Sequence, residues 1–100
     1  MLLDIIIENK NEILDIFEKY GALNVKIIGS VSRREENDDS DIDFVADLKD
    51  DNNGHTDLQA HADLLKELRI YFNRRIELAT YQQIQSQYPK ALREGVPLSR

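Results

Sequence analysis

The sequence contains no cysteine, which excludes a disulfide framework and any chemistry that depends on a thiolate. It also has no apolar run approaching the ~20 residues that a membrane span requires. The apolar start at residues 2–7 is interrupted by Asp4 and is not preceded by a basic segment, so it does not resemble a targeting signal. No repeat, linker or low-complexity stretch stands out. We therefore expect a soluble, cytoplasmic protein that does not contact a membrane.

The sequence also has fewer basic residues than acidic ones. Thirteen Lys and Arg stand against 19 Asp and Glu, which gives a net charge of −6. This balance argues against direct binding of nucleic acid, because domains that bind nucleic acid are usually basic. It suits a basic protein partner, or a site that recruits an anionic nucleotide through a metal ion. With 100 residues, 41% of them hydrophobic, the chain predicts a single domain over residues 1–100 with one modest core.

The hydrophobic periodicity predicts helices that alternate with strands. The first helix should end at Gly21, and Thr56 should cap a later helix whose apolar face carries Leu58, Ala62, Leu65 and Leu68. Such an order of elements predicts an α/β (α+β) domain, a small mixed sheet with flanking helices. The expected helices cover 2–20, 30–36, 56–71, 81–87 and 90–94, the strands 24–28, 42–48 and 74–80, followed by a loose tail from residue 95.

The most informative feature is the spacing between Gly29-Ser30 and the triplet Asp41-Ile42-Asp43. Residues i and i+2 of a strand point to the same side of a sheet, so Asp41 and Asp43 should point toward one spot while Ile42 enters the core. Two carboxylates so close repel each other unless a cation lies between them. Gly-Ser at the end of a strand offers backbone N–H groups to a phosphate. Together they indicate a metal-dependent enzyme that acts on nucleotides.

Each half of this pattern has a simpler reading. Gly-Ser is common where a strand ends and a helix begins, and the run Asp38 to Asp41 has the composition of a solvated turn. Asp43 does not fit that reading, because it lies between Ile42 and Phe44 inside an apolar strand, where Asp is rare. A charge in such a position usually has a partner. The pattern as a whole therefore favours a functional site over a solvated turn.

The segment from Gly29 to Val45 resembles the signature of the minimal nucleotidyltransferases, small relatives of the DNA polymerase beta superfamily, in which Gly-Ser is followed at a similar interval by Asp-x-Asp. The rest of the chain is consistent with this resemblance, which implies the nucleotidyltransferase fold, two Mg²⁺ ions and ATP as co-substrate. The implied catalytic residues and metal ligands are Asp41, Asp43 and Glu77, and the implied residues at the triphosphate are Gly29, Ser30 and Arg33.

The sequence departs from this family pattern at two positions. Family members commonly have Gly where this chain has Arg34, so the loop could meet the triphosphate differently. The third metal carboxylate is often Asp, whereas the matching residue here is Glu77, which keeps the charge and adds one methylene. Metal binding should survive the second change.

Within this family, chains of about this size are similar to the antitoxins of HEPN–MNT toxin–antitoxin pairs. Those antitoxins transfer AMP from ATP to a tyrosine of the HEPN ribonuclease. The resemblance therefore implies a HEPN-type toxin as partner, in a hetero-oligomer. Two other functions stay open from the residues: transfer to the hydroxyl of a small molecule such as an antibiotic, and an antitoxin that neutralises its partner by binding alone.

Overall fold

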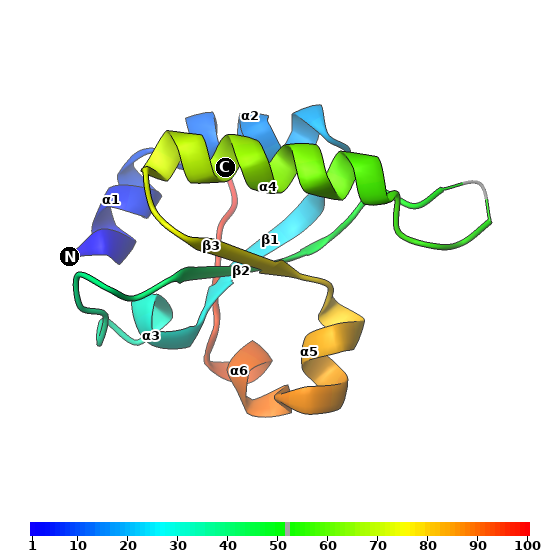
Figure 1. Ribbon diagram of the computed structural model, residues 1–100. Helices are drawn as coiled ribbons and strands as arrows, with labels where there is room; N and C mark the ends of the chain where they lie inside the picture. Colours follow the sequence, from blue (N-terminus) through cyan, green and yellow to red (C-terminus); the bar gives the residue numbers. More distant parts are fainter. Residues whose placement is uncertain (52) are drawn as a thin grey trace.

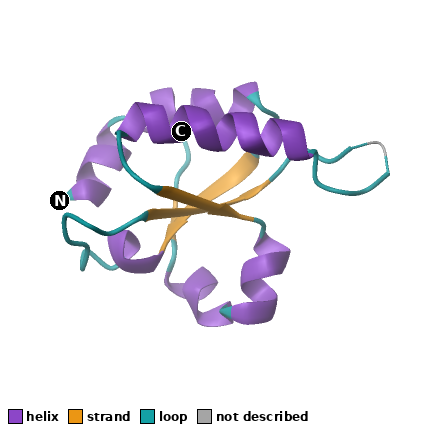
Figure 2. Ribbon diagram, in the orientation of Figure 1, coloured by secondary structure: helices purple, strands orange, loops and turns teal. Residues whose placement is uncertain are grey.

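The centre of the molecule is a four-stranded mixed sheet with the order β3-β2-β1-β4 (Figures 1 and 2). It is seen in a computed structural model that describes residues 1–51 and 53–100. β1 pairs antiparallel with β2 and with β4, while β2 and β3 run parallel. The α/β class and the mixed sheet expected from the sequence are confirmed. The strands are β1 (Leu23–Ile28), β2 (Ile42–Asp47), β3 (Ile76–Ala79) and β4 (Val96–Pro97).

Helices cover both faces of this sheet. Figure 1 shows α1, α2 and α4 on one face and α3, α5 and α6 on the other. Among the described residues, no helix is both long enough and apolar enough to cross a membrane. The helices are α1 (Leu2–Glu8), α2 (Lys10–Lys19), α3 (Gly29–Ser32), α4 (Leu58–Phe72), α5 (Tyr81–Gln87) and α6 (Pro89–Glu94).

The hydrophobic core lies between the sheet and the layer of α1, α2 and α4. Phe44 of β2 is 1% exposed and packs edge-on against Phe17 of α2, with ring centroids 5.2 Å apart. Phe72, at the end of α4, lies 6.0 Å from Phe44 on the same side. Because side chains alternate along a strand, directing Phe44 into this core directs Asp43 to the opposite face. The packing of the core thus decides which face of the sheet carries the carboxylates.

The predicted helix over residues 2–20 is two helices, and the prediction of one helix is wrong. Asn9 separates them, and its side-chain amide donates a hydrogen bond to the carbonyl of Ile5 at 2.8 Å. Asn side chains compete in this way with the backbone hydrogen bonds of a helix. The predicted end of the second helix is confirmed, since Gly21 follows Tyr20 with a φ of +76°, which glycine adopts without strain.

The long helix α4 also differs from the prediction in its cap and its buried face. Asp57, not Thr56, is the N-cap, and its carboxylate accepts the N–H of Ala60 at 3.0 Å. The buried pair is Leu64 and Leu68, whereas Leu58 is 76% exposed. The predicted apolar face included only Leu68 of this pair, because several apolar residues of this helix satisfy helical spacing and the sequence does not show which of them meets the sheet.

The expected loose tail after residue 95 is the clearest error of the sequence reading. Val96 and Pro97 form β4 on the outer edge of β1, and the N–H of Leu98 donates to the carbonyl of Val25 at 2.9 Å. Leu98 is only 4% exposed. Pro is tolerated here because β4 is an edge strand, where one N–H needs no partner in the sheet. A strand of two residues is too short to give a periodic signal.

Candidate active site

The sheet topology brings three distant segments to one end of the central strands. β2 begins directly after Asp41; β1 ends there because it runs antiparallel, and β3 begins there because it runs parallel. In the register, Asp43 lies opposite Ile28 on one side and opposite Glu77 on the other. Residues paired in this way point to the same face. This topology places the Gly29-Ser30 turn, which follows Ile28, beside the carboxylates.

The structure brings Asp41, Asp43 and Glu77 together, as expected. Each contributes one carboxylate oxygen to a cluster in which these oxygens all lie within 4.8 Å of one another. Asp41 and Asp43 are half-buried, while Glu77 is exposed at the edge. Within the described part of the chain, no other group of three or more His, Cys, Asp or Glu side chains has spacing suited to a metal ion.

One carboxylate oxygen of this cluster lacks the partner that a buried charge normally has. Oδ1 of Asp43 is buried and has no hydrogen-bond partner within the described residues, whereas Oδ1 of Asp41, also buried, lies 2.8 Å from the guanidinium of Arg75. Buried oxygens without partners are rare, and several negative charges at one point are unfavourable without a cation. Mg²⁺ prefers carboxylate oxygens and few of them. The three residues therefore fit a divalent metal ion.

The electrostatic conflict is greatest at Asp43. Burial, together with the neighbouring negative charges of Glu77 and Asp41, raises the pKa of its carboxyl from 3.8 to about 6. The positive charge of Arg33 acts in the opposite direction. In the metal-free protein, Asp43 therefore takes up a proton at a higher pH than an ordinary aspartate. Metal binding would reverse this effect, since a cation favours the ionised form.

This raised pKa predicts a pH dependence of stability. Because the folded state holds the Asp43 proton more tightly than the unfolded state, its contribution is greatest below about pH 3.8 and is lost as the pH rises through about 6. Asp43→Asn removes the charge at every pH. In the presence of a chelator, the melting temperature of this variant relative to wild type should therefore increase as the pH rises from 3.8 to about 6, and should stay constant at higher pH. A difference that does not change with pH would contradict the assignment.

Gly29 is required at its position by two separate features. Its φ is +76°, a conformation that residues with a side chain rarely adopt. A Cβ atom placed on Gly29 would overlap Oδ2 of Asp43 and lie 3.3 Å from its Cγ. The backbone of Gly29 thus forms one wall of the carboxylate cluster, a role that the sequence pattern did not indicate.

The other two predicted triphosphate residues lie on the same loop. Ser30 is half-buried in the first turn of α3, and its carbonyl accepts the N–H of Glu35. Arg33 follows α3, is exposed, and forms an ion pair with Glu35 at 3.0 Å. It is close enough to Asp43 to lower the pKa of that carboxyl. The structure therefore brings Arg33 to the site, and a contact between phosphate and either residue stays a prediction.

Arg34, the position at which the expected sequence signature has Gly, lies just after α3. Its φ is +59°, in the left-handed region, and this conformation ends α3 at Ser32 instead of continuing to the predicted Glu36. Its guanidinium turns to α1 and pairs with Asp4 at 2.8 Å. The local backbone is thus one that glycine adopts readily, and the side chain is held by α1.

Arg75 was not singled out from the sequence, yet it contacts the carboxylate cluster. Its Nε lies 2.8 Å from Oδ1 of Asp41, and it also donates a hydrogen bond to the carbonyl of Asp39. Arg75 precedes Glu77 by two positions, so strand alternation could have placed both on one side. Among the described residues, its guanidinium is the cation that pairs with Asp41.

We expect Arg75→Ala to change the affinity of the site for metal ions. Removing a cation from Asp41 should strengthen binding of Mn²⁺ by a few-fold, in keeping with the roughly 0–1 kcal/mol of an exposed ion pair. Titration followed by the electron paramagnetic resonance of free Mn²⁺ measures this directly. Lys66→Ala is the control, because it removes the same charge from an exposed position on α4. Equal affinities for both variants would show that the contact is only incidental.

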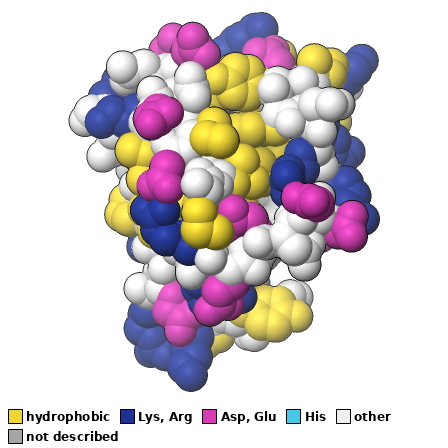
Figure 3. Space-filling view, turned by 90° about the vertical axis from the view of Figure 1, so that its left-hand side faces the viewer, with side chains coloured by type: hydrophobic (Ala, Val, Ile, Leu, Met, Phe, Trp, Pro, Cys, Tyr) yellow, Lys and Arg dark blue, Asp and Glu magenta, His cyan; other side chains and the backbone are white. Residues whose placement is uncertain are grey.

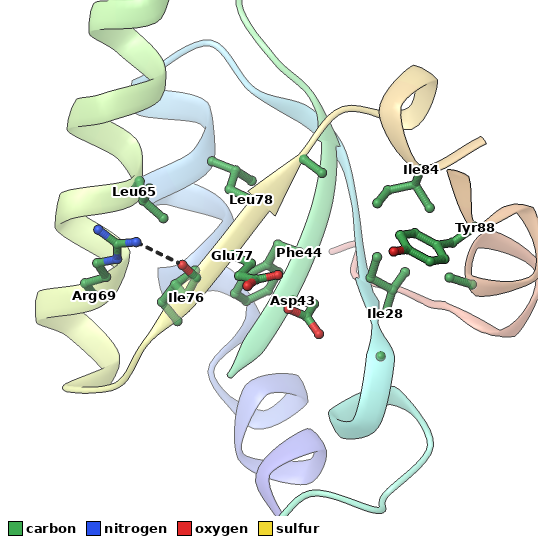
Figure 4. A pocket seen from close by; sticks show the side chains of 13 residues that line it. Ile28, Asp43, Phe44, Leu65, Arg69, Ile76, Glu77, Leu78, Ile84 and Tyr88 are labelled. Carbon is green, nitrogen blue, oxygen red and sulfur yellow. Dashed lines mark hydrogen bonds between the residues drawn. The ribbon is translucent and has the colours of Figure 1, made fainter. Parts of the chain in front are cut away.

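A cavity of about 520 Å³ adjoins the carboxylates and reaches the edge of β3. Ile28, Asp43 and Glu77 line it from the sheet, and Ile84 and Tyr88 line it from α5 and the junction with α6. Figure 4 shows the ring of Tyr88 beside Ile28 and Ile84. The volume lies within the range of about 300–1,000 Å³ typical of small-molecule sites. Tyr88 was not identified from the sequence, because its position depends on how α5 and α6 fold back over the sheet.

Comparison with solved structures supports the fold expected from the sequence. No family model and no curated protein matches the sequence. Among solved structures, a protein assigned as a minimal nucleotidyltransferase superposes with a TM-score of 0.77 at 28% identity, over 96% of this chain and 95% of that one. A toxin–antitoxin complex with AMP-PNP gives a TM-score of 0.68 at 18% identity, over 91% of this chain and 73% of that one. A mutant of the toxin–antitoxin MntA–HpeT gives 0.66 at 18% identity, over 91% and 72%.

The fold is therefore that of a nucleotidyltransferase domain, as the sequence predicted. Within that class, the chain resembles a minimal nucleotidyltransferase along nearly its whole length. It also shares its fold with toxin–antitoxin structures, at a lower sequence identity.

Proposed function

We propose that this protein is an antitoxin-type adenylyltransferase, which transfers AMP from ATP to a tyrosine hydroxyl of a HEPN-type toxin. The observation that carries the proposal is the cluster of Asp41, Asp43 and Glu77 against the backbone of Gly29. It combines a site for hard cations with a glycine turn at the start of a helix, and a nucleotide with bound metal needs both. The solved structures of the same fold support the choice of reaction.

The three carboxylates would hold two Mg²⁺ ions, which neutralise the phosphates and lower the pKa of the attacking hydroxyl when bound. The crowding of the three carboxylates and the unpartnered buried oxygen of Asp43 are the structural reasons for this assignment. Gly29 allows phosphate oxygens to approach the backbone, Ser30 offers its N–H and hydroxyl, and Arg33 adds positive charge. In such a transfer, the protein mainly positions the reactants and neutralises charge.

The reaction exchanges one phosphorus–oxygen bond for another. The acceptor oxygen attacks the α-phosphorus of ATP in line, the bond to the bridging oxygen breaks, and pyrophosphate leaves with the bonding electrons. The cavity beside Asp43 and Glu77 is lined by apolar side chains such as Ile28 and Ile84, and it would accommodate the nucleoside. Its open side at the edge of β3 leaves room for an acceptor.

The surface suits a protein acceptor. Figure 3 views the molecule from the side of the N-terminus, where acidic and basic side chains surround a group of hydrophobic ones. Such a mixture of apolar area with a charged border is typical of protein interfaces. The net charge of −6 would speed association with a basic toxin.

The test is to incubate the protein with ATP, Mg²⁺ and the product of the neighbouring gene, and to weigh that product by intact mass spectrometry. A gain of one or more AMP residues that requires metal is the expected result. Asp41→Ala serves as the comparison. If this variant still neutralises the toxin while the toxin gains no mass, the protein acts by binding alone. If the wild type neither modifies nor binds the neighbour, that protein is not the acceptor, and small hydroxylated molecules are the next to test.

A further inference from the structure

We propose that Tyr88 of this chain is itself an acceptor, so that the protein transfers a nucleotidyl group to its own Tyr88. This inference rests on the proposed nucleotidyl transfer, but it adds a modification site that the transfer to a partner does not require. Three observations lead to it: the place of Tyr88 in the cavity, the state of its hydroxyl, and the packing of the helices that carry it.

Tyr88 shares a cavity with the reactive groups. It lines the same space as Gly29, Asp43 and Glu77. In Figure 4 Ile28 lies between the ring of Tyr88 and Asp43, and the hydroxyl end of the ring is directed toward the strands. A nucleotide with its phosphates at Gly29 would therefore occupy a space that this phenol borders. Among the residues that the structure describes, no other tyrosine lines this cavity.

The hydroxyl of Tyr88 also differs in its hydrogen bonding from the hydroxyls of the other three tyrosines. The hydroxyls of Tyr20 and Tyr71 donate to Glu67 and Glu12 at 2.7 and 2.8 Å, and that of Tyr81 donates to the carbonyl of Asn24. Tyr88 donates to no described residue and is 63% exposed. These partners hold the other three hydroxyls outside the cavity, whereas Tyr88 lines it and has no such contact among the described residues.

The helices on either side of Tyr88 are less deeply buried than the helices on the other face of the sheet. Neither α5 nor α6 has a fully buried residue, in contrast to α2 and α4, which bury several. Tyr88 ends α5 and Pro89 begins α6, so the junction itself carries the ring. Segments with few buried apolar contacts open most easily. Such a junction can bring the hydroxyl of Tyr88 closer to a bound nucleotide without unfolding the sheet.

The proposed step is balanced in the same way as transfer to a partner. The phenolic oxygen of Tyr88 forms a bond to the α-phosphorus of ATP, and the bond between that phosphorus and the bridging oxygen breaks. Pyrophosphate leaves with the bonding electrons, and the phenolic proton passes to water at the mouth of the cavity. The product is a phosphodiester between Tyr88 and AMP, which places the nucleotide over the protein's own site. We expect modified protein to act on its partner more slowly.

The experiment uses the full chain with ATP and Mg²⁺, with no partner present. We expect the intact mass to rise by one AMP residue, and fragmentation to place the group on Tyr88. The rate per molecule should not change with protein concentration, as an intramolecular step requires. Tyr88→Phe, which keeps the ring and removes the hydroxyl, should gain no mass. Tyr81→Phe is the matched control and should be modified like wild type.

A parallel assay with the toxin separates this proposal from the proposed function. If the toxin is modified by wild type and by Tyr88→Phe while the chain itself gains no mass, Tyr88 is not an acceptor and the proposed function stands. Modification at any residue other than Tyr88 also overturns the proposal. If neither the chain nor the toxin is modified, both the proposal and the proposed function fail.

Discussion

Asp43→Asn should reduce nucleotidyl transfer by at least about 100-fold, the order found when one charge-stabilising group is removed from an active site. Asn occupies nearly the same volume but carries no charge, so the site would lose a metal ligand and keep its shape. The fold should not suffer. Without metal, the carboxylate of Asp43 is half-buried beside Glu77 and Asp41, and its charge opposes folding at neutral pH. We expect the variant to melt at the same temperature as wild type or higher.

Asp47→Asn is the matched control for this variant. Asp47 ends the same strand on the same face as Asp43, but it is exposed and accepts a hydrogen bond from Asn24 at 2.6 Å. It should keep near wild-type transfer. The activity and the melting temperature of both variants should be measured side by side. If Asp43→Asn transfers the nucleotidyl group at a rate close to wild type, Asp43 does not take part in the reaction.

Gly29→Ala should damage both stability and activity. An alanine with φ near +76° is strained by roughly 1–2 kcal/mol. Its Cβ would also overlap Oδ2 of Asp43, and relieving such a clash costs about 1–3 kcal/mol more. The relief must move Asp43 or the turn, and a displacement of about 1 Å at a reacting centre can reduce the rate by 10²-fold.

Gly54→Ala separates the two effects. Gly54 has a similar φ of +80°, but a Cβ there would meet nothing within 4 Å. It should therefore show the backbone strain alone, with unchanged transfer. Urea unfolding gives the difference in the free energy of unfolding between the two variants. If both lose the same stability and both keep their activity, the close approach of Gly29 to Asp43 has no functional consequence.

The carboxylate cluster could be predicted because its information is local. Asp41 and Asp43 lie two residues apart in one strand, and alternation alone places them on one face. Glu77 came from the family resemblance, and the parallel pairing of β3 with β2 is what brings it opposite Asp43. The fold class followed in the same way from the alternation of helices and strands.

The errors arose where the structure depends on contacts between distant segments. β4 forms because the outer edge of β1 is free to pair with it. Val96 and Pro97 are too few to give a periodic pattern that would predict a strand. The buried face of α4 depends on the orientation of the helix over the sheet. Tyr88 reaches the site because α5 and α6 fold back over the sheet, which residue spacing does not predict. Arg75 reaches it through the pairing of β3 with β2, although its position two residues before Glu77 could have indicated a shared face.

The most direct test of the central claim is to follow the label from ATP onto the proposed toxin partner, with ATP labelled at either the α- or the γ-phosphate. Transfer of a nucleotidyl group through the Asp41, Asp43 and Glu77 cluster predicts that the α-label enters the partner and the γ-label is released as pyrophosphate. The label should not enter when Mg²⁺ is chelated or when Asp43 is replaced by Asn. Incorporation of the γ-label, or of the α-label in the absence of metal, would contradict the account.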